Sequence, residues 1–226
     1  MSDEFLSFTL RPVETHHDLL MACSVRAQAY GRKDPAYRET MSVPDAVDAS
    51  PWTAVFLCED KATGEPIGTM RVQSTTRGSS RLEIEKYVEP PPELTLFGRA
   101  EITRLAAVHG ADPFVRLALW KAAYLYCMAI QARWLLIGVR KPALLKAYER
   151  MGARDIFEDR RTVRLGYGGN LPHRILALHI GSCEQRFREE NNPLYPFMFG
   201  AVHQDIAVVP SVHRDIAKEV RLHVVQ

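Results

Sequence analysis

The sequence contains neither a cysteine motif nor a histidine cluster. Its four cysteines are widely scattered and form no CxxC pair, and its eight histidines show no HxxxH or HExxH spacing. Such spacings are the sequence signals of disulfide frameworks and zinc sites. We therefore expect reduced thiols, as in a cytoplasmic protein, and no metal site.

Long apolar runs and a strong charge of either sign are also missing. The most apolar window, residues 117–139, is interrupted by Lys121, Gln131 and Arg133, and the N-terminal MSDEFLSF has no basic segment followed by an apolar core. We therefore expect neither a membrane span nor a signal peptide. Lys and Arg outnumber Asp and Glu by only 29 to 27, so the charge does not indicate a nucleic-acid surface.

What is present is a chain of 226 residues that is 46% hydrophobic, enough to bury the core of one domain with an extension. We interpret residues 1–182 as the core and residues 183–226 as an extension that packs on it. Alternating or continuous apolar residues predict strands over residues 5–13, 52–59, 66–74, 100–108, 133–140, 153–157 and 174–180, with a weaker one over 81–88.

Helices are predicted over residues 14–30, 114–131 and 142–152, with a long loop over 31–51 and a final helix over 211–222. Asp112 and Pro113 are typical of a helix start, and Gly152 can end a helix in a left-handed conformation. Strand, helix and strand across residues 100–139 make a right-handed crossover. The order predicts an α/β fold, a mixed sheet with helices on both faces.

The fourth strand, AEITRLAAV, carries two charges in an apolar setting. Glu101 and Arg104 stand three residues apart, so a regular strand would direct them to opposite faces. Both can serve one cleft only if the strand is bulged or strongly bent between or beside them, as strands near active sites often are.

This order of elements resembles the GNAT acyltransferase superfamily over roughly residues 5–181, which implies a central, mostly antiparallel, twisted sheet. The segment KPALLKAYERMGARDI is similar to the superfamily motif in which a helix carries a tyrosine, here Tyr148, shortly before a glycine, here Gly152. Coenzyme A-dependent members carry a glycine-rich turn after the fourth strand, where backbone amides hold the pyrophosphate. Here VHGADPFVRLAL has Gly110 alone, with Arg116 near the superfamily's basic residue.

That departure is typical of one GNAT branch, the acyl-homoserine-lactone synthases and the related N-acyl amino acid synthases. Their acyl chains come from acyl carrier protein, whose phosphopantetheine offers a single phosphodiester. The chain is similar to the polar signature of this branch, in order, at Arg26, Tyr30, Asp45, Asp48, Arg71, Glu101 and Arg104. The lactone synthases also carry a tryptophan after the first helix. GRKDPAY has none, and Trp52 comes too late, which favours N-acylation of an amino acid or similar amine over lactone formation.

The resemblance implies roles for these residues. Glu101 would take the proton of the amine, and Tyr148 would donate a proton to the departing sulfur. Backbone amides around Leu105 to Val108 would bind the oxyanion. Arg104 or Arg71 would bind the carboxylate of an amino-acid acceptor. Arg26, Asp45 and Asp48 would form an ion-pair network that fixes the loop.

The resemblance also implies a donor and partners. No cofactor is expected to be tightly bound, and acyl-phosphopantetheine on acyl carrier protein, or acyl-CoA, would supply the acyl group. The resemblance implies a long acyl chain. An acidic carrier would suit the basic residues Arg116, Lys121, Arg140, Lys141, Lys146 and Arg150. The aromatic-rich stretch at 195–199 is open to three roles: lining an acyl tunnel, packing on the sheet edge, or forming a homodimer.

Several alternatives stay open at this point. The protein could be a coenzyme A-dependent N-acetyltransferase, an acyl-homoserine-lactone synthase, or a GNAT-like binding module without catalysis. Glu101 and Arg104 could be an exposed ion pair on an edge strand. Asp45 and Asp48 could be ordinary turn and cap residues, Arg26 could face water, and Tyr30 could belong to the core.

Overall fold

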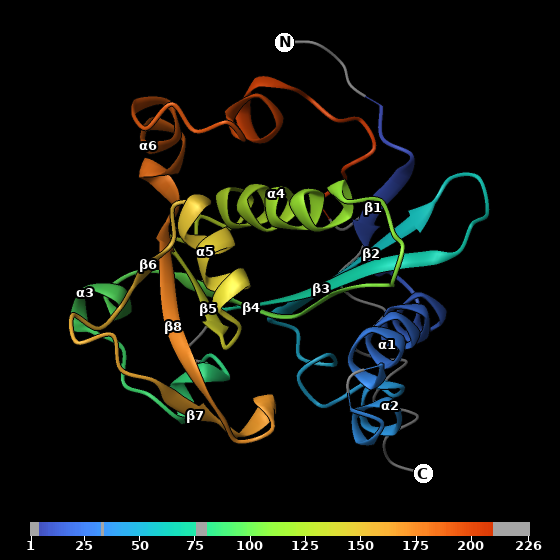
Figure 1. Ribbon diagram of the computed structural model, residues 1–226, viewed down its shortest axis with the longest axis horizontal. Coiled ribbons are helices and arrows are strands. Elements are labelled where there is room, and N and C mark those ends of the chain that lie inside the picture. Colours follow the sequence, from blue (N-terminus) through green and yellow to red (C-terminus); the bar gives the residue numbers. More distant parts are fainter. Residues whose placement is uncertain (1–4, 33, 76–80, 210–226) are drawn as a thin grey trace. The chain divides into compact units, whose positions relative to one another are not determined.

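The computed structural model describes residues 5–32, 34–75 and 81–209, and these residues form a mixed α/β sheet with helices (Figure 1). Its strands are β1 (Phe8–Pro12), β2 (Thr53–Asp60), β3 (Pro66–Ser74), β4 (Arg99–Ala107), β5 (Trp134–Val139), β6 (Arg154–Asp155), β7 (Val163–Leu165) and β8 (Leu171–His179). Its helices are α1 (His16–Gly31), α2 (Ala36–Met41), α3 (Pro92–Thr95), α4 (Phe114–Ala129), α5 (Pro142–Arg150) and α6 (Cys183–Glu189).

The strand order is β1-β2-β3-β4-β5-β8-β6, and β7 pairs with β8. The β4–β5 pair is parallel, whereas β1–β2, β5–β8, β6–β8 and β7–β8 are antiparallel. A parallel pair requires a crossover, and α4 supplies it between β4 and β5. The predicted α/β fold with a mostly antiparallel sheet is therefore confirmed.

The chain forms two compact units. The α1 unit contains the described residues up to 72, residues 104–126 and residues 203–209, and the α5 unit contains the described residues from 73 to 103 and residues 127–202. Strands β3 and β4 contribute residues to both units.

In the α1 unit, helices cover both faces of the sheet. Val55 and Leu57 of β2 pack with Leu19 of α1 in one buried cluster. Phe56, which points to the other face, meets Tyr126 of α4 edge to face at 5.6 Å between ring centroids. The alternation of side chains along β2 thus directs neighbouring residues to different helices.

A C-terminal segment covers the outer edge of β1. The Leu10 amide donates to the Asp205 carbonyl at 2.7 Å, the Ala207 amide donates to the Leu10 carbonyl at 2.8 Å, and the Lys61 ammonium meets the Asp205 carboxylate at 2.7 Å. An uncovered edge strand can pair with other chains, so this part of the extension satisfies an otherwise open edge. The final helix predicted over 211–222 lies outside the described residues.

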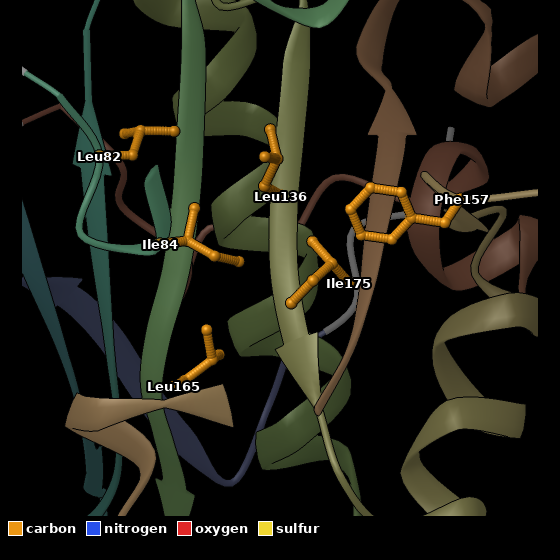
Figure 2. Close-up of a cluster of buried hydrophobic side chains, with 6 residues drawn as sticks. All are labelled: Leu82, Ile84, Leu136, Phe157, Leu165 and Ile175. Atoms are coloured by element: carbon orange, nitrogen blue, oxygen red, sulfur yellow. The ribbon is translucent and has the colours of Figure 1, made fainter. Parts of the chain in front are cut away.

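In the α5 unit, the two faces of the sheet meet different partners. Gly152, just after α5, has a φ of 88°, as its sequence position predicted, and a Cβ there would lie 3.2 Å from a methyl carbon of Leu178 on β8. Ile175, three residues before Leu178, points to the opposite face. It joins a cluster with Leu82, Ile84, Leu136, Phe157 and Leu165, whose side chains converge in Figure 2.

The weak strand predicted over residues 81–88 is wrong. Residues Ile84–Lys86 form a 3₁₀ turn. The amides of Leu82, Glu83 and Ile84 donate to side-chain oxygens, those of Glu85, Gln73 and Glu101 respectively, instead of to a neighbouring strand. The strand predicted over 153–157 is only two residues long, and β7, α3 and α6 were not predicted. Among the described helices, none is long and apolar enough to cross a membrane.

We predict that Leu136→Ala lowers the free energy of unfolding by about 2–5 kcal/mol, because Leu136 is fully buried in the cluster of Figure 2 and truncation leaves a cavity. Leu96→Ala removes the same atoms from a side chain that is 74% exposed and should change stability by less than about 0.5 kcal/mol. Denaturant titration measures both variants, and equal losses would contradict this packing.

Candidate functional site: a broken central strand and a buried ion network

Arg104, inside β4, has a left-handed backbone conformation with a φ of 55°. This left-handed conformation is unfavourable for a residue with a side chain, by roughly 1–2 kcal/mol. The parallel pairing of β4 with β5 covers Arg99–Ile102. The left-handed residue therefore makes a break in the regular alternation of side chains at Arg104, the kind of irregularity on which a shared cleft for Glu101 and Arg104 depends.

A buried ion pair lies at the centre of the α1 unit. Two guanidinium nitrogens of Arg26, on α1, donate to the two carboxylate oxygens of Asp48 at 2.8 and 3.0 Å. The side chains are 2% and 0% exposed. Burial of these charges is stable only because each has a close partner. The alternative in which Arg26 faces water is wrong.

Two further arginines reach the same loop. Nη1 of Arg71, on β3, donates to both oxygens of Asp45 at 2.7 and 2.8 Å, and lies 3.5 Å from Asp48. Nη2 of Arg104 donates to Asp45 at 3.2 Å. Three arginines thus share two aspartates, and the Asp45 side chain, at 37% exposure, is the most accessible of the five.

The same aspartates fix the backbone of the loop. The amides of Val47 and Asp48 donate to Asp45 Oδ1, and the Asp45 amide donates to Asp48 Oδ2. The interpretation of Asp45 and Asp48 as turn residues is therefore correct but incomplete, because the carboxylates also bind Arg26, Arg71 and Arg104.

Electrostatics keep this network charged. Burial acts to raise the pKa of Asp45, but the charges and hydrogen bonds of Arg71 and then Arg104 outweigh it and hold that pKa well below its ordinary range. Tyr30 donates its hydroxyl to the Leu105 carbonyl at 3.2 Å, and burial raises its pKa. Tyr30 therefore stays protonated at neutral pH and binds β4 just beyond its break.

Glu101, in the α5 unit, is 0% exposed. Its Oε1 accepts from the Tyr167 hydroxyl at 2.6 Å and its Oε2 accepts from the Ile84 amide at 2.9 Å. Since β4 lies between β3 and β5, the alternative of an exposed pair on an edge strand is wrong. Tyr148, on α5, is 7% exposed.

The segment from β4 to α4 differs at Val108 from the predicted set of oxyanion donors. The Val108 amide donates to the Ile67 carbonyl at 3.0 Å, so it is not free to bind an acyl oxygen. Asp112 accepts from the Phe114 amide at 2.8 Å and from the Ser7 hydroxyl at 2.6 Å. Its carboxylate thus occupies the start of α4, as the sequence predicted.

The predicted basic surface is only partly exposed. Arg116 is exposed in the α1 unit, and Arg140, Lys146 and Arg150 are exposed in the α5 unit. Lys121 is 4% exposed, so including it in a docking surface was wrong. Within the described residues, no three His, Cys, Asp or Glu side chains are grouped as metal ligands.

A match to a known protein family shows which family the chain belongs to. The model of the family described as "N-acyl amino acid synthase FeeM" matches residues 21–171, more than half of the chain. The protein belongs to the FeeM family of N-acyl amino acid synthases. It is therefore an N-acyltransferase of the GNAT type. No curated protein matches the chain.

Solved structures agree on the fold. FeeM, an N-acyl amino acid synthase from uncultured soil microbes, is 18% identical with a TM-score of 0.62, over 84% of this chain and 98% of that chain. BjaI, a coenzyme A-dependent acyl-homoserine lactone synthase, is 13% identical with a TM-score of 0.56, over 95% and 99%. FdhC, a nucleotide-linked sugar GNAT, is 12% identical with a TM-score of 0.53, over 82% and 94%. The FeeM-family chain thus has a GNAT fold.

We predict that Asp48→Asn lowers the free energy of unfolding by about 3–5 kcal/mol, because it leaves the buried charge of Arg26 uncompensated. Asp45→Asn makes the same chemical change at a half-exposed carboxylate and should cost clearly less, since water reaches the Asp45 position and Arg71 keeps Asp48 as a second partner. Urea titration at pH 7 compares the two. A larger loss for Asp45→Asn would contradict the central position of Asp48.

Proposed function

We propose that the protein transfers a long-chain acyl group from acyl carrier protein to the amine of an amino acid or a similar small molecule. The observation that carries this proposal is the FeeM family match, which spans Arg26 to Tyr148 and with them every charged residue of the proposed site. Buried free thiols and a carrier-protein donor are in keeping with a cytoplasmic enzyme.

The reaction forms an amide bond and breaks a thioester. The amine nitrogen attacks the thioester carbonyl carbon, the carbonyl oxygen gains negative charge, and the C–S bond then breaks to release the carrier's thiolate. Glu101 takes the proton that the amine loses, and Tyr148 donates a proton to the sulfur. Because the Val108 amide is already bonded to Ile67, the proposed oxyanion donors are restricted to the backbone from Leu105 to Ala107.

The two arginines proposed to bind the acceptor's carboxylate differ in how far they are buried. Arg71 is 0% exposed and holds both oxygens of Asp45 through one nitrogen. Arg104 is 14% exposed and lies 3.2 Å from Asp45. We therefore assign carboxylate binding to Arg104, and a supporting role in the ion network to Arg71.

Asp112 supports acyl carrier protein as the donor. A pyrophosphate at a helix start is bound by free amides in a positive field, whereas Asp112 occupies the Phe114 amide and brings a negative charge to the start of α4. A single phosphodiester loses less from this arrangement. The exposed cations Arg140, Lys146 and Arg150 suit an acidic carrier, and a homodimer stays a prediction.

A coenzyme A donor is the second candidate. It is favoured by the likeness to BjaI, a coenzyme A-dependent acyl-homoserine lactone synthase whose structure was solved with isopentyl-CoA. The missing tryptophan after α1 still argues against lactone formation as the product step.

The donor is identified by product analysis. The protein is incubated with long-chain acyl carrier protein, long-chain acyl-CoA or acetyl-CoA, each with pooled amino acids and S-adenosylmethionine, and the products are identified by mass spectrometry. We expect an N-acyl amino acid from the carrier donor. Transfer from acetyl-CoA alone would contradict the proposal, and long-chain acyl-CoA as the preferred donor would support the second candidate.

We predict that Glu101→Gln lowers turnover by roughly 10²–10⁴-fold, the range for loss of a general base. The amide keeps the size of the carboxylate and retains a carbonyl oxygen for the Ile84 amide, so the melting temperature should change little. Glu89→Gln, at an exposed position of the α5 unit, is the matched control. Full activity of Glu101→Gln would exclude Glu101 as the base.

A further inference from the structure

Both oxygens of the Glu101 carboxylate are held by neutral donors from outside β4. The Tyr167 hydroxyl donates to Oε1 at 2.6 Å and the Ile84 amide donates to Oε2 at 2.9 Å. The Tyr167 bond has the length typical of an O–H donor on a carboxylate. Two donors from different segments of the α5 unit therefore fix the orientation of this carboxylate.

The turn that carries Tyr167 is closely packed against its neighbours. The ring meets Tyr87 edge to face at 5.8 Å between centroids. A Cβ on Gly166 would lie 2.5 Å from the Tyr87 hydroxyl, and one on Gly168 would lie 2.6 Å from the His173 ring. Glycine on both sides of Tyr167 therefore permits an approach that larger residues would obstruct.

We propose that Tyr167 is a positioning residue for the acyl transfer: its hydroxyl orients the Glu101 carboxylate and stabilises it in the ionised form that accepts the amine proton. The inference rests on the role of Glu101 in the proposed function. A carboxylate at 0% exposure has lost its hydration, and hydrogen bonds from fixed donors replace part of it. Tyr167 supplies such a bond without adding a charge that would compete for the proton.

Other titratable groups lie close to Ile84 or Tyr167, the two donors of Glu101, in the α5 unit. Glu85 is ion-paired with Arg99, and Tyr87 and His173 line the glycines beside Tyr167. Burial lowers the pKa of His173, so it is uncharged at neutral pH. Because these groups also titrate, the pH profile is combined with a measurement that is specific to Glu101.

Tyr167→Phe tests the proposal because it keeps the aromatic ring against Tyr87 and removes the hydroxyl alone. We expect kcat to fall about tenfold, the effect of losing a hydrogen bond to a charged group, with KM for both substrates changed less than about twofold. The ascending limb of the pH profile of kcat/KM should move up by about one pH unit, because an ionised carboxylate loses a favourable donor. Tyr87→Phe removes a neighbouring hydroxyl and should leave both readouts unchanged.

Carbon NMR of protein labelled at glutamate carboxyl carbons provides the second measurement, with Glu101→Gln to assign the signal. The Glu101 titration midpoint should move to higher pH in Tyr167→Phe and stay in Tyr87→Phe. An unchanged midpoint would overturn the inference, whether or not the protein transfers acyl groups. An inactive Glu101→Gln with a fully active Tyr167→Phe would overturn the inference alone, whereas a fully active Glu101→Gln would overturn the proposed function.

Discussion

Asp48 accepts two hydrogen bonds from Arg26 at a point where neither side chain meets water, and much of the α1 unit depends on this pair. Oδ2 of Asp48 also accepts a hydrogen bond from the Asp45 amide. This bond turns the loop so that the Asp45 carboxylate meets Arg71 and Arg104. A buried charge without a partner would cost several kcal/mol. The pair therefore links α1, the loop, β3 and the second half of β4. A change in one of these elements disturbs the others.

Strand β4 carries two polar sites, Glu101 before its break and Arg104 at the break. Before Arg104, Glu101 accepts hydrogen bonds from neutral donors, Tyr167 and the Ile84 amide. At the break, Arg104 joins the ion network, because its guanidinium group donates to the Asp45 carboxylate. A left-handed residue such as Arg104 is unfavourable in a strand, and its contact with Asp45 offsets that cost.

Local pattern was enough to predict the strands β1 to β5, the helices α1, α4 and α5, and the left-handed Gly152, because each is a repeating or capping signal. The residues of the ion network came from a resemblance, and no pattern shows that Asp48 meets Arg26, 22 residues away. The turn at Ile84 was missed because its amide acceptor, Glu101, lies 17 residues further on. Tyr167 was missed for the same reason, since 66 residues separate it from Glu101, and β7 is too short for periodicity to appear.

The claim that Glu101 accepts the proton of the amine depends on where the new amide bond forms. A crystal structure of the protein with a bound N-acyl amino acid tests it most directly. We predict that the amide nitrogen of the product lies about 2.6–3.2 Å from a carboxylate oxygen of Glu101, or is joined to it through one water molecule. An ordered product whose amide nitrogen is out of reach of Glu101, beside a different proton acceptor, would contradict the account.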